Sequence, residues 1–150
     1  TSRPMGAAVA DLAEVIVTLV DVGDERLNGG DARAANAAFQ EAWQILPLPK
    51  LDHPHAALVL GALADAAFVA GNFAEARRVL EEALRTGLGA ANPALHLRRG
   101  QVAFELEEDD IAVVELLRAY ELAGAEIFDG EAPKYLRLLH NHVAALGTVA

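Results

Sequence analysis

Small and bulky apolar residues recur along this chain in a fixed order that appears three times. In each copy a small residue is followed twelve positions later by alanine, four later by a bulky apolar residue, and three later by a second alanine. The spacings of four and three place these last three residues on one face of a helix. The copies begin 41 and 36 residues apart, close to the period of a helix-turn-helix repeat. They are Gly23, Ala35, Phe39 and Ala42; Ala64, Ala76, Leu80 and Ala83; and Gly100, Ala112, Leu116 and Ala119.

Glycine and proline mark where the helices between and around these positions begin and end. Glycines follow most of the apolar segments, and glycine adopts the left-handed conformation that closes a helix. Pro54, Pro93 and Pro133 fall in predicted first turns, where proline loses no hydrogen bond. The predicted helices are Ala8–Leu27, Ala32–Leu46, Pro54–Ala70, Phe73–Arg85, Pro93–Leu106, Asp109–Leu122 and Pro133–Leu146.

The composition supports an all-α fold. The chain is 53% hydrophobic with few aromatic residues, and no strict alternation of apolar and polar positions persists. A single helix pair cannot bury its apolar face alone, so three pairs are expected to stack. We predict one domain over residues 1–150, with helix pairs at about 16–50, 57–90 and 93–124 and a C-terminal capping helix at about 133–146.

These residues resemble the tetratricopeptide repeat (TPR) family. The family's turn and second helix match Gly-Asp-Ala-Arg-Ala-Ala at 30–35, which Phe39, Ala42 and Pro47 follow, and Gly-Asn-Phe-Ala-Glu-Ala at 71–76. The third copy has lost the turn glycine. The resemblance implies a right-handed α-solenoid of three TPR-like helix pairs. It also implies a protein–protein interaction module that binds a peptide or a segment of a partner protein in its concave groove.

The sequence departs from the family pattern in its first helices. The family's large aromatic residue there is replaced by Leu19, Leu60 and His96. Arg99 stands where an apolar residue is usual, so the third repeat is expected to pack atypically against the capping helix.

Carried over from the family, the groove would present twelve residues of the first helices. It would have an apolar floor, with three aspartates towards one end, which suits an apolar segment that carries Lys or Arg. One TPR subgroup clamps a peptide C-terminal carboxylate with Lys, Asn and Arg. At those places this chain has Val20, Asp24, Ala62, Ala94 and Arg98, so no such clamp is expected. The twelve groove residues are Val17, Val20, Asp21, Asp24, Leu58, Gly61, Asp65, Phe68, Leu97, Arg98, Gln101 and Phe104.

Almost all of the net charge of −10 lies in the C-terminal third. Residues 105–131 contain ten acidic side chains and one basic side chain, Arg118. Phosphate repulsion makes nucleic acid an unexpected partner, whereas a basic protein or peptide would be attracted. The alternative is a solvated acidic face that only keeps the protein in solution. The candidate acidic recognition patch consists of Glu105, Glu107, Glu108, Asp109 and Asp110.

The sequence contains no pattern typical of an enzyme. It has no cysteine, no glycine-rich phosphate loop and no His-Glu-x-x-His pair, and Ser2 is its only serine. His53 and His55 beside Asp52 could supply metal ligands, but a closed site needs a further ligand, so exposed loop histidines are favoured. We therefore expect no catalysis, cofactor or metal. No transmembrane span or signal peptide is visible, so we expect a cytoplasmic protein without a membrane partner.

A second, shorter resemblance concerns the segment 124–139. It is similar to the tail of small bacterial TPR proteins encoded near secreted polymorphic toxins. This similarity implies an immunity protein or secretion chaperone as an alternative function. A further alternative is a structural unit that self-associates into a homo-oligomer through its apolar groove or end helix.

Overall fold

The structure of this protein is a computed structural model, which describes the backbone of residues 5–148 and the side chains of residues 11–144. Within these residues the chain forms seven α-helices and two short 3-10 helices, and no strand occurs. The elements are α1 (Met5–Asn28), α2 (Ala32–Ile45), η1 (Lys50–Asp52), α3 (Ala56–Val69), α4 (Phe73–Leu84), α5 (Pro93–Glu105), α6 (Asp109–Ala123), η2 (Ala125–Phe128) and α7 (Pro133–Thr148).

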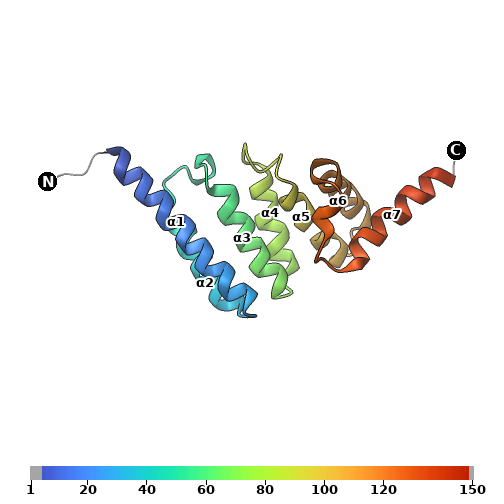
Figure 1. Cartoon of the computed structure of the whole chain (residues 1–150), viewed down its shortest axis with the longest axis horizontal. Helices are drawn as coiled ribbons and strands as arrows, with labels where there is room; N and C mark the ends of the chain where they lie inside the picture. The colour runs from blue at the N-terminus through green and yellow to red at the C-terminus, as the bar shows by residue number, and fades with distance from the viewer. Residues whose placement is uncertain (1–4, 149–150) are drawn as a thin grey trace.

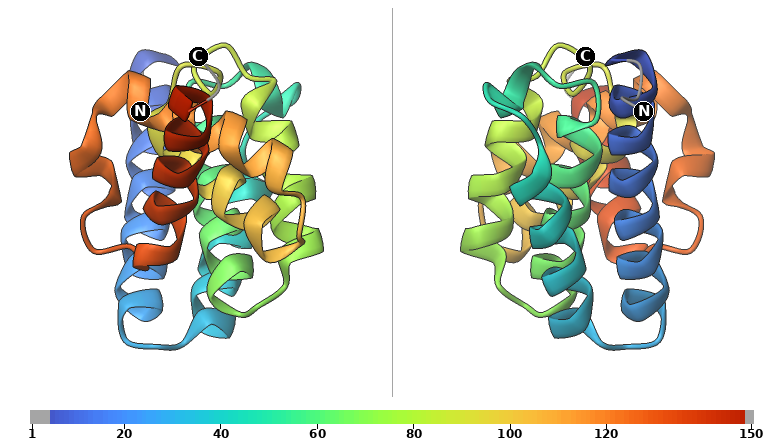
Figure 2. Two further views of the ribbon diagram at one scale, coloured as in Figure 1. Left: turned by 90° about the vertical axis from the view of Figure 1, so that its right-hand side faces the viewer. Right: turned by 90° about the vertical axis from the view of Figure 1, so that its left-hand side faces the viewer.

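The helices follow one another along the long axis of the molecule, from α1 at one end to α7 at the other (Figure 1). Consecutive helices form the pairs α1–α2, α3–α4 and α5–α6, and each pair packs on the next. Seen from either end, the helices lie one behind another in a layered stack (Figure 2). The predicted fold class is confirmed: the protein is an all-α helical-repeat solenoid with a final helix at its C-terminal end.

The threefold pattern forms the contact inside each pair. All nine Ala, bulky and Ala positions of the second helices are 0% exposed. A Cβ added to Gly23 would lie 2.2 Å from the Phe39 ring, and one added to Gly100 would lie 2.7 Å from the Leu116 side chain. Such distances are far below van der Waals contact, so the small residue is what allows the bulky side chain to fill the space between the helices.

The turns inside the pairs share one backbone conformation. Gly30 and Gly71 have φ of 88° and 78°, and Glu107 holds the equivalent position with φ of 62°. The third turn therefore keeps its shape without the glycine that this conformation favours. After the first turn, Asp31 caps α2, because its carboxylate accepts a 2.9 Å hydrogen bond from the Ala34 N–H.

A lysine closes the C-terminal end of α2. The Lys50 ammonium donates to the carbonyls of Trp43, Gln44 and Leu46 at 2.7, 3.2 and 2.8 Å. The last carbonyls of a helix lack the usual partners of the helix interior, although the Trp43 carbonyl also accepts from the Leu46 N–H at 3.2 Å, and the helix dipole is negative at this end. Lys50 therefore stabilises the end of the first pair and fixes the course of the following loop.

The two junctions between successive pairs differ in chemistry. Where α3 packs between α2 and α4, it presents Leu60 and Leu63, which are 1% and 6% exposed. The equivalent α5 positions hold His96 and Arg99. His96 Nδ1 lies 2.6 Å from Glu115 of α6, and Arg99 lies 3.5 Å from Glu81 of α4.

The structure differs from the sequence prediction in several local features. The first helix begins at Met5, three residues before the predicted Ala8. The helix predicted from Pro54 begins at Ala56, because the His55 N–H donates to His53 Nδ1 and holds a turn ahead of the helix. The 3-10 helices η1 and η2 follow no apolar period and were not predicted. The Arg99 guanidinium is directed to α4, where its Nη2 lies 3.5 Å from Glu81.

Candidate functional site

The first helices of the three pairs enclose a hollow of about 170 Å³, called here the inner hollow. Its lining includes Val20 and Asp24 from α1, Leu58, Gly61, Ala62 and Asp65 from α3, and Ala94 and Arg98 from α5. Gly61 keeps α3 and α5 close, because a Cβ there would lie 3.0 Å from the Leu95 side chain. Six of the twelve predicted groove residues thus line one hollow, and residues from all three repeats contribute to it.

Two carboxylates give the inner hollow its charge. Burial raises the pKa of Asp24, and the nearby Asp65 and Asp21 raise it further. Burial also raises the pKa of Asp65, against the opposing effect of Arg98 and with a smaller contribution from Glu131. Neighbouring carboxylates that disfavour each other's ionised form attract a cation placed between them. The inner hollow is therefore suited to a positively charged group.

Arg98 is already engaged within the protein. Its Nε lies 2.8 Å from Asp65 Oδ1, its Nη1 lies 2.9 Å from Gln101 Oε1, and its guanidinium stacks 4.3 Å from the centre of the Phe68 ring. All five positions that the TPR resemblance equates with a carboxylate clamp line the inner hollow. Arg98 is the only basic residue among them, and Asp65 neutralises it. The charge at these positions is therefore opposite to that of a site that binds a carboxylate.

The structure corrects two of the predicted groove residues. Leu97 and Gln101 are 6% and 0% exposed, and neither lines the inner hollow. Leu97 packs with Phe128 of η2 and Tyr135 of α7. The Gln101 amide donates to Glu131 at 2.9 Å. The segment that follows α6 folds back over α5 and covers the third repeat's share of the groove.

The remaining predicted groove residues lie near the inner hollow but do not line it. Val17 and Asp21 are exposed on α1. Phe68 is partly buried beneath Arg98. The Phe104 ring meets Tyr135 edge to face at 5.3 Å, so the last helix covers it as well. The open part of the predicted groove therefore belongs mainly to the first two repeats.

The predicted acidic patch is divided by the structure. Glu105 does not join the turn, because its carboxylate accepts hydrogen bonds from Tyr135 at 2.7 Å and binds Lys134 at 2.5 Å. Although burial opposes the effect, these two partners hold the pKa of Glu105 below its ordinary value. Burial and Glu105 raise the pKa of Tyr135. Glu105 thus anchors α7 and is not available as a recognition residue.

The other four acidic residues stay together at the start of α6. They line a shallow hollow of about 450 Å³ with Ile111. Glu108 pairs with Arg77 of α4 at 2.8 Å, whereas Glu107, Asp109 and Asp110 are exposed. The patch is therefore smaller than predicted, and it adjoins an apolar side chain.

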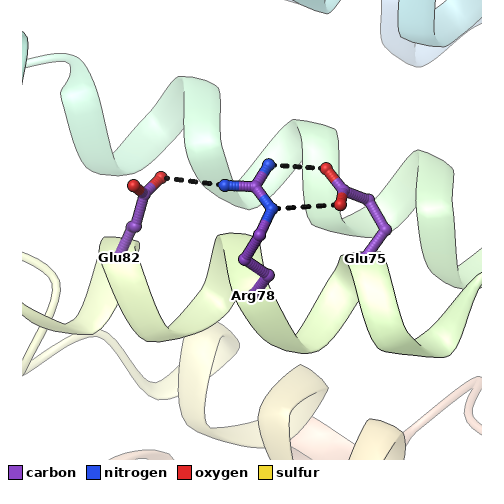
Figure 3. A network of polar contacts seen from close by, with 3 residues as sticks. All are labelled: Glu75, Arg78 and Glu82. Atoms are coloured by element: carbon purple, nitrogen blue, oxygen red, sulfur yellow. Dashed lines mark hydrogen bonds and ion pairs between the residues drawn. The ribbon is translucent and has the colours of Figure 1, made fainter.

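A larger hollow of about 470 Å³, which the sequence did not indicate, lies between α2 and α4. Its floor includes Leu63 of α3, and Trp43 and Gln40 of α2 form part of one wall. The opposite wall carries Arg78 of α4 between two glutamates, at 2.6 Å from Glu75 and 3.7 Å from Glu82 (Figure 3). Trp43 is partly buried and also packs against the core.

Among the described residues no group of three or more His, Cys, Asp or Glu side chains could hold a metal ion. No helix in this part of the chain is long and apolar enough to cross a membrane.

The stacked helix pairs, the small-to-bulky packing and the three equivalent turns together define the TPR fold, and a solved structure agrees. The chain is similar to the first TPR domain of Spaghetti (RPAP3) bound to the HSP90 peptide SRMEEVD, with a TM-score of 0.68 and 18% identity. The alignment covers 89% of this chain and 97% of that domain. No family model matches the chain, and no curated protein matches it.

Proposed function

We propose that this protein is a protein–protein interaction module whose inner hollow binds an extended peptide segment carrying a lysine or arginine beside apolar residues. The observation that carries this proposal is the pair Asp24 and Asp65, whose side chains line the same hollow, where burial and the neighbouring Asp65 raise the pKa of Asp24. Asp65 is held by Arg98, so Asp24 is the carboxylate left to receive a cation.

The apolar part of the ligand has contacts close to Asp24. Leu58 is 44% exposed and lines the same hollow as Val20. Burying the exposed part of such a side chain contributes on the order of 1 kcal/mol. A cation on Asp24 fixes the position of the segment, and an apolar neighbour on Leu58 adds affinity. This division of roles is common where one polar group orients a ligand in an apolar site.

The charge of the site argues against an acidic ligand. The peptide in the similar Spaghetti (RPAP3) structure, SRMEEVD, carries three acidic side chains and one arginine. In this chain the equivalent region has Asp21, Asp24 and Asp65 against an arginine that is already paired. We infer that the two domains share a fold and differ in the charge of the ligand they accept.

The proposal describes a binding module and assigns it no catalysis. A cytoplasmic location, a bacterial origin and an immunity or chaperone role stay predictions from the sequence. Nothing in the geometry of the inner hollow depends on them.

A charge-matched peptide series tests the proposal. The probe is a fluorescein-labelled nonapeptide of three Leu-Lys-Pro units, whose prolines keep it extended. Its counterparts are the same peptide with glutamate for lysine, and SRMEEVD. Fluorescence anisotropy is expected to show binding of the lysine peptide alone. Tight binding of either acidic peptide would contradict the proposal.

Asp24→Asn is expected to weaken binding of the lysine peptide about tenfold, because it removes a charge-assisted contact. Glu41→Gln, an equal charge change at an exposed position of α2, is the matched control and should leave affinity unchanged. Affinity should also fall as the pH is lowered and Asp24 takes up a proton. Because the pKa of Asp24 is raised, this fall in affinity should begin at a higher pH than for an aspartate of ordinary pKa. Asp24→Asn should abolish that pH dependence. Equal affinities of the two variants would refute the role of Asp24.

A further inference from the structure

The outer surface of α6 differs from the same surface of α4. Counted from the threefold pattern, three positions of α4 hold the charged side chains Glu75, Arg78 and Glu81. The equivalent positions of α6 hold three apolar side chains that are 37%, 64% and 36% exposed. We call these three residues the α6 ridge: Ile111, Val114 and Leu117.

The α6 ridge is not needed to build the fold. The core face of α6 consists of Ala112, Leu116 and Ala119, each 0% exposed, together with Val113. The segment after α6 meets it through Tyr120, whose ring lies 6.5 Å from Phe128. Large exposed apolar residues that the core does not use are typical of an interaction surface.

The geometry of the ridge suits a helix as partner. Its residues are three apart, so they form one oblique row along the first two turns of α6. Rows of this spacing pack into the groove between the side-chain rows of a second helix. An apolar helix face laid across α6 would cover Val114, the most exposed of the three.

Charge decides which helix fits. Ile111 shares the hollow of about 450 Å³ with Glu107, Glu108, Asp109 and Asp110. The whole segment 105–131 has ten acidic residues against Arg118. A second copy of this chain would bring two such segments together, and like charges would oppose that contact. A helix with lysine or arginine flanking its apolar face would be attracted.

We propose that the α6 ridge and its acidic border form a second docking surface, which binds a basic amphipathic helix of a partner protein. This surface is independent of the inner hollow, because it belongs to the outer side of the third repeat. It assigns a role to the C-terminal concentration of charge that the peptide groove does not explain.

The test uses the full chain and an 18-residue helical peptide of leucine and lysine, with leucine at positions i, i+3, i+4 and i+7. A scrambled peptide of the same composition and a version with glutamate for lysine are the controls. Ile111→Ser/Val114→Ser is expected to weaken binding of the lysine helix about tenfold, since it removes two apolar contacts. Val69→Ser, at a valine of α3 that is 53% exposed, should not change it.

Two further measurements separate this proposal from the peptide groove. Asp24→Asn should leave binding of the lysine helix unchanged, and affinity should fall between about 50 and 500 mM salt because the contact is electrostatic at its border. Hydrogen exchange should show protection over 109–122 on binding. If Val69→Ser and Ile111→Ser/Val114→Ser have equal effects, or if light scattering finds a dimer of the free chain that only the double variant disrupts, the proposal is overturned.

Discussion

The junction between the first two repeats and the junction between the last two pack equivalent helices with different side chains. In the first, Leu60 and Leu63 of α3 form an apolar contact surface beside a hollow of about 470 Å³. In the second, His96 and Arg99 occupy the equivalent positions. Arg99 lies 3.5 Å from Glu81 of α4 across the junction, whereas His96 lies 2.6 Å from Glu115 of α6 within its own pair. The backbone repeats, and the side chains that join one repeat to the next do not.

The difference shows that equivalent positions of a helical repeat can hold either apolar or polar side chains. Apolar packing does not depend on salt concentration, so we expect salt to leave the first junction unchanged. The polar side chains that line the hollow beside this junction are not needed to hold it and face solvent. The second junction adds polar side chains to a buried apolar core that includes Leu95 and Val102. One of these polar groups is poorly satisfied, since the buried Arg99 Nη1 has no hydrogen-bond partner. An unsatisfied buried donor costs about 1–3 kcal/mol. We therefore expect the second junction to be the weaker of the two.

The largest effect is expected at the apolar junction. Leu63→Ala should lower the free energy of unfolding by about 3 kcal/mol, because it leaves a cavity where α3 meets α2 and α4. Urea denaturation followed by circular dichroism measures this loss. Leu58→Ala, on the same helix but 44% exposed, is the control and should cost less than about 1 kcal/mol. Similar losses for both variants would show that the first junction does not rely on buried apolar contact.

An intermediate effect of opposite sign is expected at Arg99. Arg99→Met should raise the free energy of unfolding by about 1 kcal/mol, because methionine keeps the buried volume and removes the unsatisfied donor. Its partner Glu81 is 49% exposed and can be solvated once the arginine is gone. The same urea experiment applies. A loss of stability in Arg99→Met would mean that the ion pair with Glu81 holds the second junction more firmly than its geometry indicates.

The smallest effect is expected at the rim of the second junction. Arg77 and Glu108 are 40% and 31% exposed and lie 2.8 Å apart. Arg77→Gln should cost about 0.5 kcal/mol at low salt and nothing measurable near 1 M salt, where exposed pairs are screened. Arg85→Gln, at an exposed residue one position beyond α4, is the control. A loss of stability that persisted at high salt would show that Arg77 contributes through packing and not through its charge.

The repeat architecture could be predicted because its cause is local in the sequence. Gly23 and Phe39 must meet for the first pair to close, and their spacing recurs in the other two pairs. Helix ends followed from glycine and proline for the same reason. The prediction was wrong at His53 and His55, where a side-chain hydrogen bond holds a turn and the helix begins two residues later than expected. The spacing of apolar residues gives no information about such a hydrogen bond.

The candidate site could be predicted only in part, because its remaining features depend on long-range contacts. The register placed Asp24, Asp65 and Arg98 around one hollow, although it gave no sign that Arg98 would be neutralised. Leu97 and Gln101 were predicted to be open to ligand and are buried, since the sequence does not show where the segment after α6 folds. The pairing of Glu105 with α7 has the same origin. A spacing rule for single helices cannot predict which side chains a terminal helix covers.

The turn between α5 and α6 bears on the use of this chain as a scaffold for design. Glu107 holds a φ of 62° where Gly30 and Gly71 stand in the other turns, and a non-glycine residue there costs about 1 kcal/mol. Long repeat arrays are built by copying one unit end to end, so any strain in that unit is multiplied by the number of copies. The second repeat, with Gly71 in its turn, is the unit to multiply. The third belongs at the end of such an array, where its strained turn and its apolar outer helix would occur once.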